Sequence, residues 1–379
     1  MSITLGQGYS RLDRTVGRGS RRRWRAAAGW GVVIALAGGC ASAEPVSPPV
    51  DSIAQGAPGA PGSAADHPSA WFGPAPGNPF LLDVSGAPVD PASADQMATL
   101  RSQLAANHGL AIINTSEFTV SYAVAPPGTP TYRVGFEDCQ RKGYRPAGLY
   151  DGPRYFEEVP IPAGALPAQG TDKHLAIWSP HTRRLWEFWV MKRGADRSWT
   201  ACWGGRIDDP SRSGGAFPVP YGASASGLSA VGTMITVDEA RRGRIEHAVG
   251  LHLTAIAVPG RTLAPATRSD GTDASPAAIP MGARLRLDPQ LDVATLPITP
   301  LAKAVARAAQ RYGFIVTETS GRVSLPIETG PRGGPGDASA NPWTEVLGDV
   351  PDYLQLKGFP WDAVRVVQAR QTPATDEEP

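Results

Sequence analysis

The sequence predicts a mainly β protein, specifically a jelly-roll-like β-sandwich with a few helical insertions. Gly (43 residues) and Pro (38 residues) are well above ordinary usage in a chain of 379 residues, which suits short strands joined by turns. Short stretches of alternating apolar and polar residues recur at spacings of roughly 10–20 residues. Helical periodicity is confined to a few segments. Many short strands with few helices are typical of one large sandwich.

The expected elements follow one another through most of the chain. Helices are expected at 91–106, 236–242 and 300–312. Pro300 suits the start of the last of these, and Gly313 is a natural stop. Strands are expected at 110–113, 118–124, 132–137, 174–178, 185–191, 199–207, 244–253, 284–287, 314–318, 323–327 and 362–367.

Residues 1–39 have the pattern of an export signal. Seven Arg residues and one acid, Asp13, come before or border the apolar run Ala26–Ala37. That run is too short for a comfortable transmembrane span. The alternative is a buried N-terminal helix, in which Arg21–Arg25 would lie in an apolar interior. We therefore interpret residues 1–39 as a signal peptide.

Cys40 follows this signal in a sequence that resembles a bacterial lipobox. Small residues precede the cysteine in Leu36-Ala37-Gly38-Gly39-Cys40, although Ala37 stands where the pattern prefers Leu. Such a cysteine is lipidated and becomes the new N-terminus. Cleavage after Ala43 is the alternative and would release a secreted protein. The expected location is the outer surface of the cell membrane, through an N-terminal lipid only, or the medium.

The chain downstream of the signal is expected to contain one folded domain. Residues 40–79 are rich in Pro, Gly and Ala and show neither strand nor helix periodicity, which predicts a disordered linker. A single β-rich domain is expected over 80–370, best defined over 159–327, with a flexible tail at 371–379. Cys139 and Cys202 would then form a disulfide in an oxidising compartment, or remain two buried thiols.

The net charge of the chain limits the kinds of partner that it is expected to bind. The chain has 36 Lys+Arg and 35 Asp+Glu, a net charge of +1, which disfavours nucleic-acid binding. Removing the seven Arg and one Asp of residues 1–39 leaves 29 basic and 34 acidic residues, a mildly acidic protein. The six His are scattered singly, so we expect no metal site and no cofactor. A monomer is expected.

A β-hairpin over residues 172–191 is the most informative part of the sequence. Ser179–Arg184 has the composition of a turn, so Ala176 would pair with Glu187. Period 2 then separates two faces. One face is wholly apolar: Leu175, Ile177, Trp186, Phe188 and Val190. The other is mixed and includes Asp172, His174, Trp178, Glu187 and Trp189.

The mixed face suggests a carbohydrate site. Trp178 and Trp189 would stack on sugar rings, because indoles bind the apolar faces of sugars. Gly204 in the next strand is expected near Glu187, where a glycine would leave room for a ligand. Glu246 and His247 are expected on opposite faces of strand 244–253, and either could complete an acid/base pair with Glu187. The candidate catalytic residues are Glu187, His174, Asp172 and His247.

The leading functional hypothesis is a tethered protein that binds a polysaccharide and, if it is an enzyme, cleaves it as a glycoside hydrolase or polysaccharide lyase. The alternative is a non-catalytic envelope-associated binding or structural lipoprotein, whose partner is a polysaccharide or other extracellular ligand. Simpler interpretations stay open. Glu187 could pair with Arg183 or Arg206, His247 could be a buried hydrogen-bonded histidine, and the Trp residues could belong to a second core face.

Several segments together resemble a family of secreted or lipid-anchored bacterial proteins that is common in actinobacteria. They are the Leu185–Trp189 strand, Tyr221–Leu228, Arg242–Ala248, Arg284–Asp288 and Ala309–Gly313. The resemblance covers roughly Val159 to Ile327. It implies the domain limits and export, and it implies no particular activity or catalytic residue.

Overall fold

The computed structural model describes residues 67–143, 146–147, 149, 154–330 and 341–368. Within these residues thirteen strands form four sheets, together with four short α-helices, so the expectation of a mainly β protein is confirmed. The expected signal peptide, Cys40 and the C-terminal tail from 371 lie outside the described residues. A membrane-crossing helix, which needs both length and apolar character, does not occur in the part of the chain that the structure describes.

The first four-stranded sheet contains the predicted hairpin. Its order is β1 (Val120–Val124), β5 (His174–Ser179), β6 (Arg184–Trp189) and β9 (Trp203–Ile207). The predicted register is confirmed, because Ala176 pairs with Glu187 and Trp178 with Leu185. β1 lies parallel to β5, whereas β6 and β9 are antiparallel.

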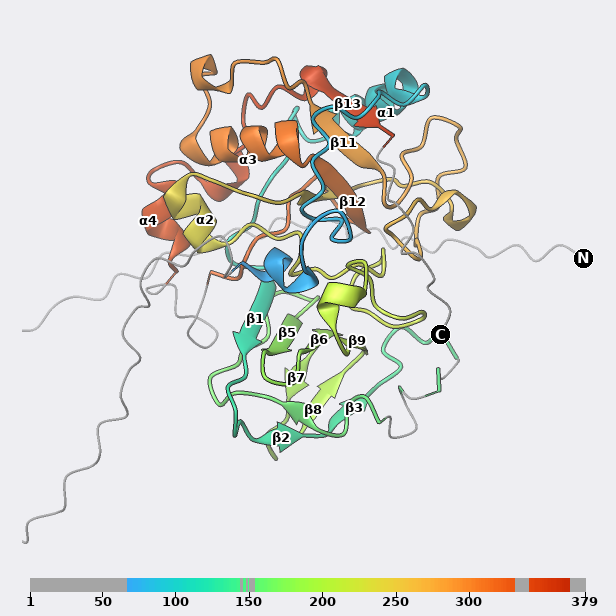
Figure 1. Cartoon of the computed structure of the whole chain (residues 1–379), viewed down its shortest axis with the longest axis vertical. Helices are drawn as coiled ribbons and strands as arrows, with labels where there is room; N and C mark the ends of the chain where they lie inside the picture. The colour runs from blue at the N-terminus through green and yellow to red at the C-terminus, as the bar shows by residue number, and fades with distance from the viewer. Residues whose placement is uncertain (1–66, 144–145, 148, 150–153, 331–340, 369–379) are drawn as a thin grey trace, which may run out of the picture. The chain divides into compact units, whose positions relative to one another are not determined.

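The second four-stranded sheet has the order β10 (Val249–Leu253), β12 (Phe314–Thr319), β11 (Arg284–Leu287) and β13 (Val364–Val367). β10 and β12 are parallel, and the other pairs are antiparallel. Helix α3 (Pro300–Arg311) packs against β11, and α1 (Ser93–Ala105) against β13 (Figure 1). Thr299 caps α3 through the Ala302 N–H, with Pro300 in the first turn, as expected.

Two small sheets complete the strands. One pairs β2 (Thr131–Tyr132) with β4 (Val159–Pro160), and the other has the order β3 (Val134–Phe136), β8 (Trp199–Ala201) and β7 (Lys192–Arg193). β3 and β8 are parallel. A jelly roll is built from antiparallel strands, so the jelly-roll sandwich is not confirmed by sheets that include three parallel pairs.

The remaining helices are short. They are α2 (Val237–Arg242), α4 (Trp343–Leu347) and the 3₁₀ turns η2 (Pro68–Phe72), η3 (Pro210–Arg212), η4 (Pro259–Arg261), η5 (Val293–Thr295), η7 (Asp352–Leu354) and η8 (Trp361–Ala363). The strands expected at 110–113 and 323–327 are instead extended segments that meet through isolated bridges, such as Ile112 with Ser324.

The hairpin sheet is buried on both faces. Leu175, Trp186 and Phe188 belong to one apolar core, as predicted for their face. Ala176, Trp178 and Leu185, from the other face, belong to the second and larger core that also surrounds β10–β13. Because the sheet is covered on both sides, its mixed face does not form the open carbohydrate site that the sequence predicts.

The folded part of the chain begins earlier than expected. The linker expected over 40–79 includes residues 67–79, but His67 and Phe72 are buried, and the Asn78 amide donates to the Ser69 and Gly73 carbonyls. The linker boundary at residue 79 is therefore wrong for this segment. A Pro- and Gly-rich composition misled the prediction because it suits ordered 3₁₀ turns as well as linkers.

Cys139 and Cys202 form a disulfide, with Cα atoms 5.6 Å apart. The predicted pairing is confirmed, and the alternative of two free thiols is wrong. The bond joins the segment after β3 to the residue between β8 and β9. It thus fastens the three-stranded sheet to the edge of the hairpin sheet.

Candidate functional site

Glu187, the centre of the predicted site, lies in the interior and not in an open cleft. Its side chain accepts hydrogen bonds from the Ser229 hydroxyl and from the N–H groups of Ala230 (3.0 Å) and Val231 (3.3 Å). Burial raises the pKa of Glu187 to about 7, although these hydrogen bonds act in the opposite direction. Neither Arg183 nor Arg206 pairs with it, since both bind Asp208 or Asp209. The contacts support a structural role, holding the 229–231 loop.

The two predicted sugar platforms, Trp178 and Trp189, both make contacts within the protein. Trp178 stacks on Trp71 with ring centroids 4.9 Å apart, so the interpretation as a second core face is confirmed for Trp178. Trp189 is half-buried, and its indole N–H donates to Asp172 at 3.2 Å. Their rings therefore contribute to packing and to a local hydrogen bond.

The expected position of Gly204 is wrong by one residue. Gly205 lies opposite Glu187, and Gly204 lies opposite Phe188. A Cβ atom built on Gly204 would approach Phe188 Cδ1 to 2.9 Å, so the space left by this glycine is filled by an aromatic ring. Glycine here serves close packing of protein atoms rather than ligand access.

Asp172 and His174 lie in a different environment from Glu187. His174 is close to His252 on β10, and burial together with His174 lowers the pKa of His252 to about 4. Asp172 is close to Glu318 on β12, whose pKa is raised to about 8, mainly by burial. The predicted catalytic residues are therefore divided among separate places in the fold.

His247 lies in a third place. It was expected on a strand over 244–253, but β10 begins only at Val249, so His247 belongs to the connection between α2 and β10. There its imidazole meets two residues that the sequence analysis did not select, Glu239 of α2 and His67. We call His67, Glu239 and His247 the buried triad, and each of them is at most 6% exposed.

The triad has close and well-defined geometry. The distance from His67 Nε2 to Glu239 Oε2 is 3.0 Å, and that from His247 Nε2 to Glu239 Oε1 is 3.2 Å. The two imidazole rings stack with centroids 4.2 Å apart. One potential ligand atom from each residue lies within 4.8 Å of the others. The carboxylate is thus shared between two imidazoles.

Local sequence explains how each member is positioned. Glu239 is the third residue of α2 and closes a capping box, in which Thr236 Oγ1 accepts from the Glu239 N–H and Glu239 Oε2 accepts from the Thr236 N–H. Gly243 ends the helix with a left-handed φ of 63°, and this reversal leads the chain back toward His247. His67 precedes η2 and accepts a hydrogen bond from the Ser69 N–H.

The hydrogen bonds indicate where the protons lie. His67 Nδ1 accepts from the Ser69 N–H, which leaves Nε2–H to donate to Glu239. Burial and the neighbouring His247 lower the pKa of His67, so this ring is neutral. Burial opposes charge on His247, but Glu239 outweighs it and raises the pKa of His247. Burial likewise opposes charge on Glu239, yet the two imidazoles hold its pKa well below the usual range.

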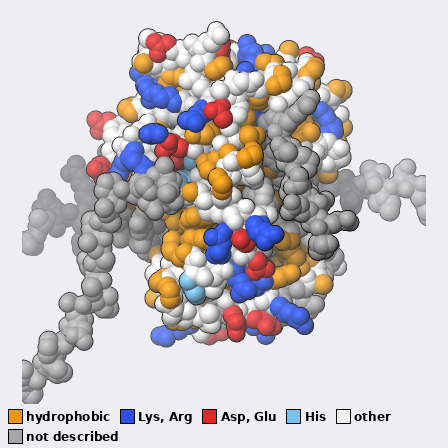
Figure 2. Space-filling view, in the orientation of Figure 1, with side chains coloured by type: hydrophobic (Ala, Val, Ile, Leu, Met, Phe, Trp, Pro, Cys, Tyr) orange, Lys and Arg blue, Asp and Glu red, His pale blue; other side chains and the backbone are white. Residues whose placement is uncertain are grey.

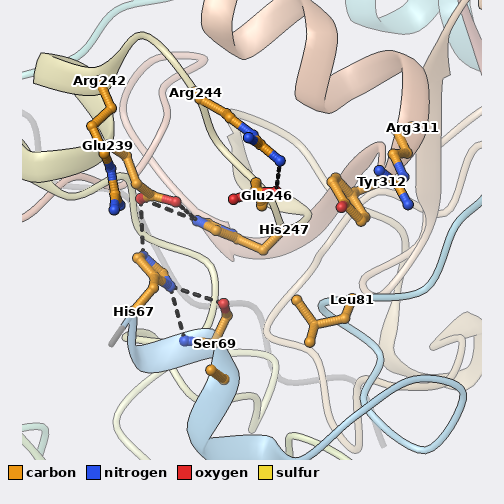
Figure 3. Close-up of a pocket in the computed structure, with 11 residues that line it drawn as sticks. His67, Ser69, Leu81, Glu239, Arg242, Arg244, Glu246, His247, Arg311 and Tyr312 are labelled. Carbon is orange, nitrogen blue, oxygen red and sulfur yellow. Dashed lines mark hydrogen bonds and ion pairs between the residues drawn. The ribbon is translucent and has the colours of Figure 1, made fainter. Parts of the chain in front are cut away.

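A cavity of about 220 Å³ adjoins the triad (Figure 3), and we call it the triad pocket. The close-up shows His67, Glu239 and His247 on one side of it, with Arg244 and Glu246 alongside and Arg311, Tyr312 and Leu81 across from them.

Two arginines at the rim of the pocket form ion pairs: Arg244 pairs with Glu246, and Arg311 pairs with Asp83 at 3.1 Å. The pocket therefore combines a buried carboxylate–imidazole centre with a rim that carries three arginines: Arg242, Arg244 and Arg311.

Of the predicted catalytic residues, only His247 lies in this pocket. The Thr236-Val237-Asp238-Glu239 capping pattern was visible in the sequence and could have placed Glu239 in the first turn of a helix. His67 had no comparable signal, because it lies in a segment of linker composition. Comparison with protein-family models, curated proteins and solved structures gave no match to this chain, so the family resemblance remains a prediction.

Proposed function

We propose that this chain is an exported, lipid-anchored protein of the cell envelope that binds an acidic polysaccharide through the triad pocket. One observation carries the proposal, the arginine-rich rim beside a buried carboxylate–imidazole centre. It moves the predicted carbohydrate site away from the hairpin, where Glu187 and Trp178 are enclosed in the core.

The chemistry of the rim favours an anionic ligand. Arg242, Arg244 and Arg311 line the pocket with one rim acid, Glu246, which pairs with Arg244, while Asp83 pairs with Arg311 from outside the lining. These five side chains carry one excess positive charge, and the charge of Glu239 is compensated by His247 inside the centre. Guanidinium groups bind carboxylate and phosphate oxygens through paired hydrogen bonds, so they suit an acidic group better than a neutral sugar. On the face drawn in Figure 2, Lys and Arg side chains lie interspersed with acidic ones.

The expected compartment supports a polymer as the ligand. An exported protein meets the acidic glycans of the envelope, and the Cys139–Cys202 disulfide suits an oxidising space outside the cytoplasm. A cavity of about 220 Å³ would admit one acidic sugar unit rather than a long segment. We therefore propose recognition of a single uronate-type residue or chain end, without assigning cleavage.

Replacing Arg242 or Arg244 by Gln is expected to weaken binding of polygalacturonate roughly tenfold, because a charge-assisted hydrogen bond contributes about 1.5–3 kcal/mol. Titration calorimetry measures this effect, with neutral dextran as the reference ligand. Arg241→Gln is the matched control. Arg241 is on helix α2 next to Arg242, pairs with Asp238 and Glu345, and does not line the pocket. Equal affinity in the Arg242, Arg244 and Arg241 variants would contradict the proposal.

The proposed anchor has its own test. Labelled palmitate is expected to enter the wild-type chain in a bacterial host and to be absent from a Cys40→Ala variant, because the thiol of Cys40 carries the lipid. Cys40→Ala should also move the protein from the membrane fraction to the medium. Palmitate that persists in this variant would show that Cys40 is not the anchor, and cleavage after Ala43 would then be favoured.

A further inference from the structure

We infer that the buried triad is a binding site for a divalent transition metal ion of the zinc class, held by His67, Glu239 and His247. Two imidazoles and one carboxylate are a recurring ligand set for Zn²⁺ in proteins. The inference concerns the pocket proposed above to bind an acidic group, but it does not rest on that function. Metal binding is measured without any polysaccharide.

The spacing of the donor atoms fits such an ion. Metal–ligand bonds of about 2.0–2.1 Å in a tetrahedral site place neighbouring ligand atoms about 3.3 Å apart. One carboxylate oxygen, Glu239 Oε2, lies 3.0 Å from His67 Nε2 and 3.4 Å from His247 Nε2, and both distances are close to this value. Small side-chain movements would therefore bring all three atoms around one centre.

The surroundings of the triad are those of a prepared metal site. His247 Nδ1 lies 2.9 Å from the Ala248 carbonyl oxygen, which fixes Nε2 as the nitrogen that faces Glu239. Metal binding at His67 Nε2 would require the proton of this ring to move to Nδ1, which lies 2.9 Å from Ser69 Oγ and could donate a hydrogen bond to it. Thr236 Oγ1 is 2.9 Å from Glu239 Oε2 and orients the carboxylate. Each ligand thus has a hydrogen-bonding partner behind it.

The arrangement also leaves room for a further ligand. The three side chains border the triad pocket, so an ion held by them would face a cavity of about 220 Å³ (Figure 3). Metal sites with three protein ligands and one accessible position bind a water molecule or an anionic oxygen there. An ion at this point would add positive charge next to the arginine rim, where an acidic group would bind.

Zinc binding to the full chain, purified without a polyhistidine tag and treated with EDTA, tests the inference. Titration calorimetry with ZnCl₂ should show one ion per chain, and His67→Ala or Glu239→Gln should weaken binding at least tenfold. His181→Ala is the matched control, because His181 lies in the β5–β6 turn and contacts only Ser179 among the described hydrogen bonds. A stoichiometry near zero, or equal binding by all variants, would overturn it.

A spectroscopic measurement on the wild-type chain avoids dependence on how well the variants fold. X-ray absorption at the zinc edge should report two imidazole nitrogens and carboxylate oxygen around the bound ion. A shell without imidazole would overturn the inference. If zinc binds as expected but polygalacturonate does not, the proposed function fails and the metal site stands. Polygalacturonate binding by a chain that takes up no zinc would give the reverse result.

Discussion

Glu187→Ala is expected to lower the free energy of unfolding by about 3–5 kcal/mol. The substitution removes the acceptor of three hydrogen bonds and leaves the Ser229 hydroxyl and the Ala230 and Val231 N–H groups without it, while it also opens a cavity in the core. Urea denaturation followed by tryptophan fluorescence measures the change. Glu158→Ala, the same substitution at an exposed position, should change the stability by less than about 0.5 kcal/mol. A similarly small loss at position 187 would contradict the structural role of Glu187.

The pH dependence of stability gives a second measurement at the same residue. The pKa of Glu187 rises from 4.5 to about 7 on folding, so the folded chain binds this proton more tightly than the unfolded chain. The contribution of Glu187 to stability is therefore greatest below pH 4.5, falls as the pH rises toward 7, and is constant above that. Glu187→Gln does not titrate. Relative to this variant, the wild type should lose about 3 kcal/mol across that interval.

Loss of the Cys139–Cys202 disulfide is expected to cost about 4 kcal/mol of stability. The bond closes a loop over a sequence separation of 63 residues. In the chain-entropy model, breaking it raises the entropy of the unfolded chain, and this stabilises the unfolded state by about 4 kcal/mol. Urea denaturation of a Cys139→Ala/Cys202→Ala variant measures the effect.

The control for the disulfide is chemical. Dithiothreitol should lower the unfolding midpoint of the wild type to that of the double variant, and it should leave the double variant unchanged. A midpoint of the wild type that does not respond to full reduction, confirmed by thiol labelling, would show that the cross-link adds nothing to stability.

The hairpin shows both the reach and the limit of prediction from the sequence. Turn composition and period 2 were enough for its register, because pairing across a short connection is a local property. The same alternation cannot tell a ligand-binding face from a second core face. Residues Ser229–Val231 cover Glu187, and Trp71 covers Trp178. Neither segment is close to the hairpin in the sequence.

The triad shows why most of the candidate site could not be predicted from the sequence. His247 was expected on a strand over 244–253 as a partner of Glu187, but it lies before β10 and lines the triad pocket, which does not include Glu187. Glu239 and His67 meet it only through tertiary packing. A search for metal ligands by sequence spacing looks for residues a few positions apart, whereas His67 and Glu239 are 172 positions apart in the sequence (239 − 67).

The position of His67 early in the chain has a consequence for the order in which the contacts of the domain form during folding. During synthesis His67 emerges well before Glu239 and His247, which it contacts in the folded protein. The contacts of His67 with Glu239 and His247 cannot form until more than half of the domain has been made, whereas other contacts of η2, such as Trp71 with Trp178, can form earlier. Closing so long a loop is slow and entropically costly, so the pairing of His67 with Glu239 belongs to the late stages of folding. The triad is then completed only after the chain has been made at least as far as His247.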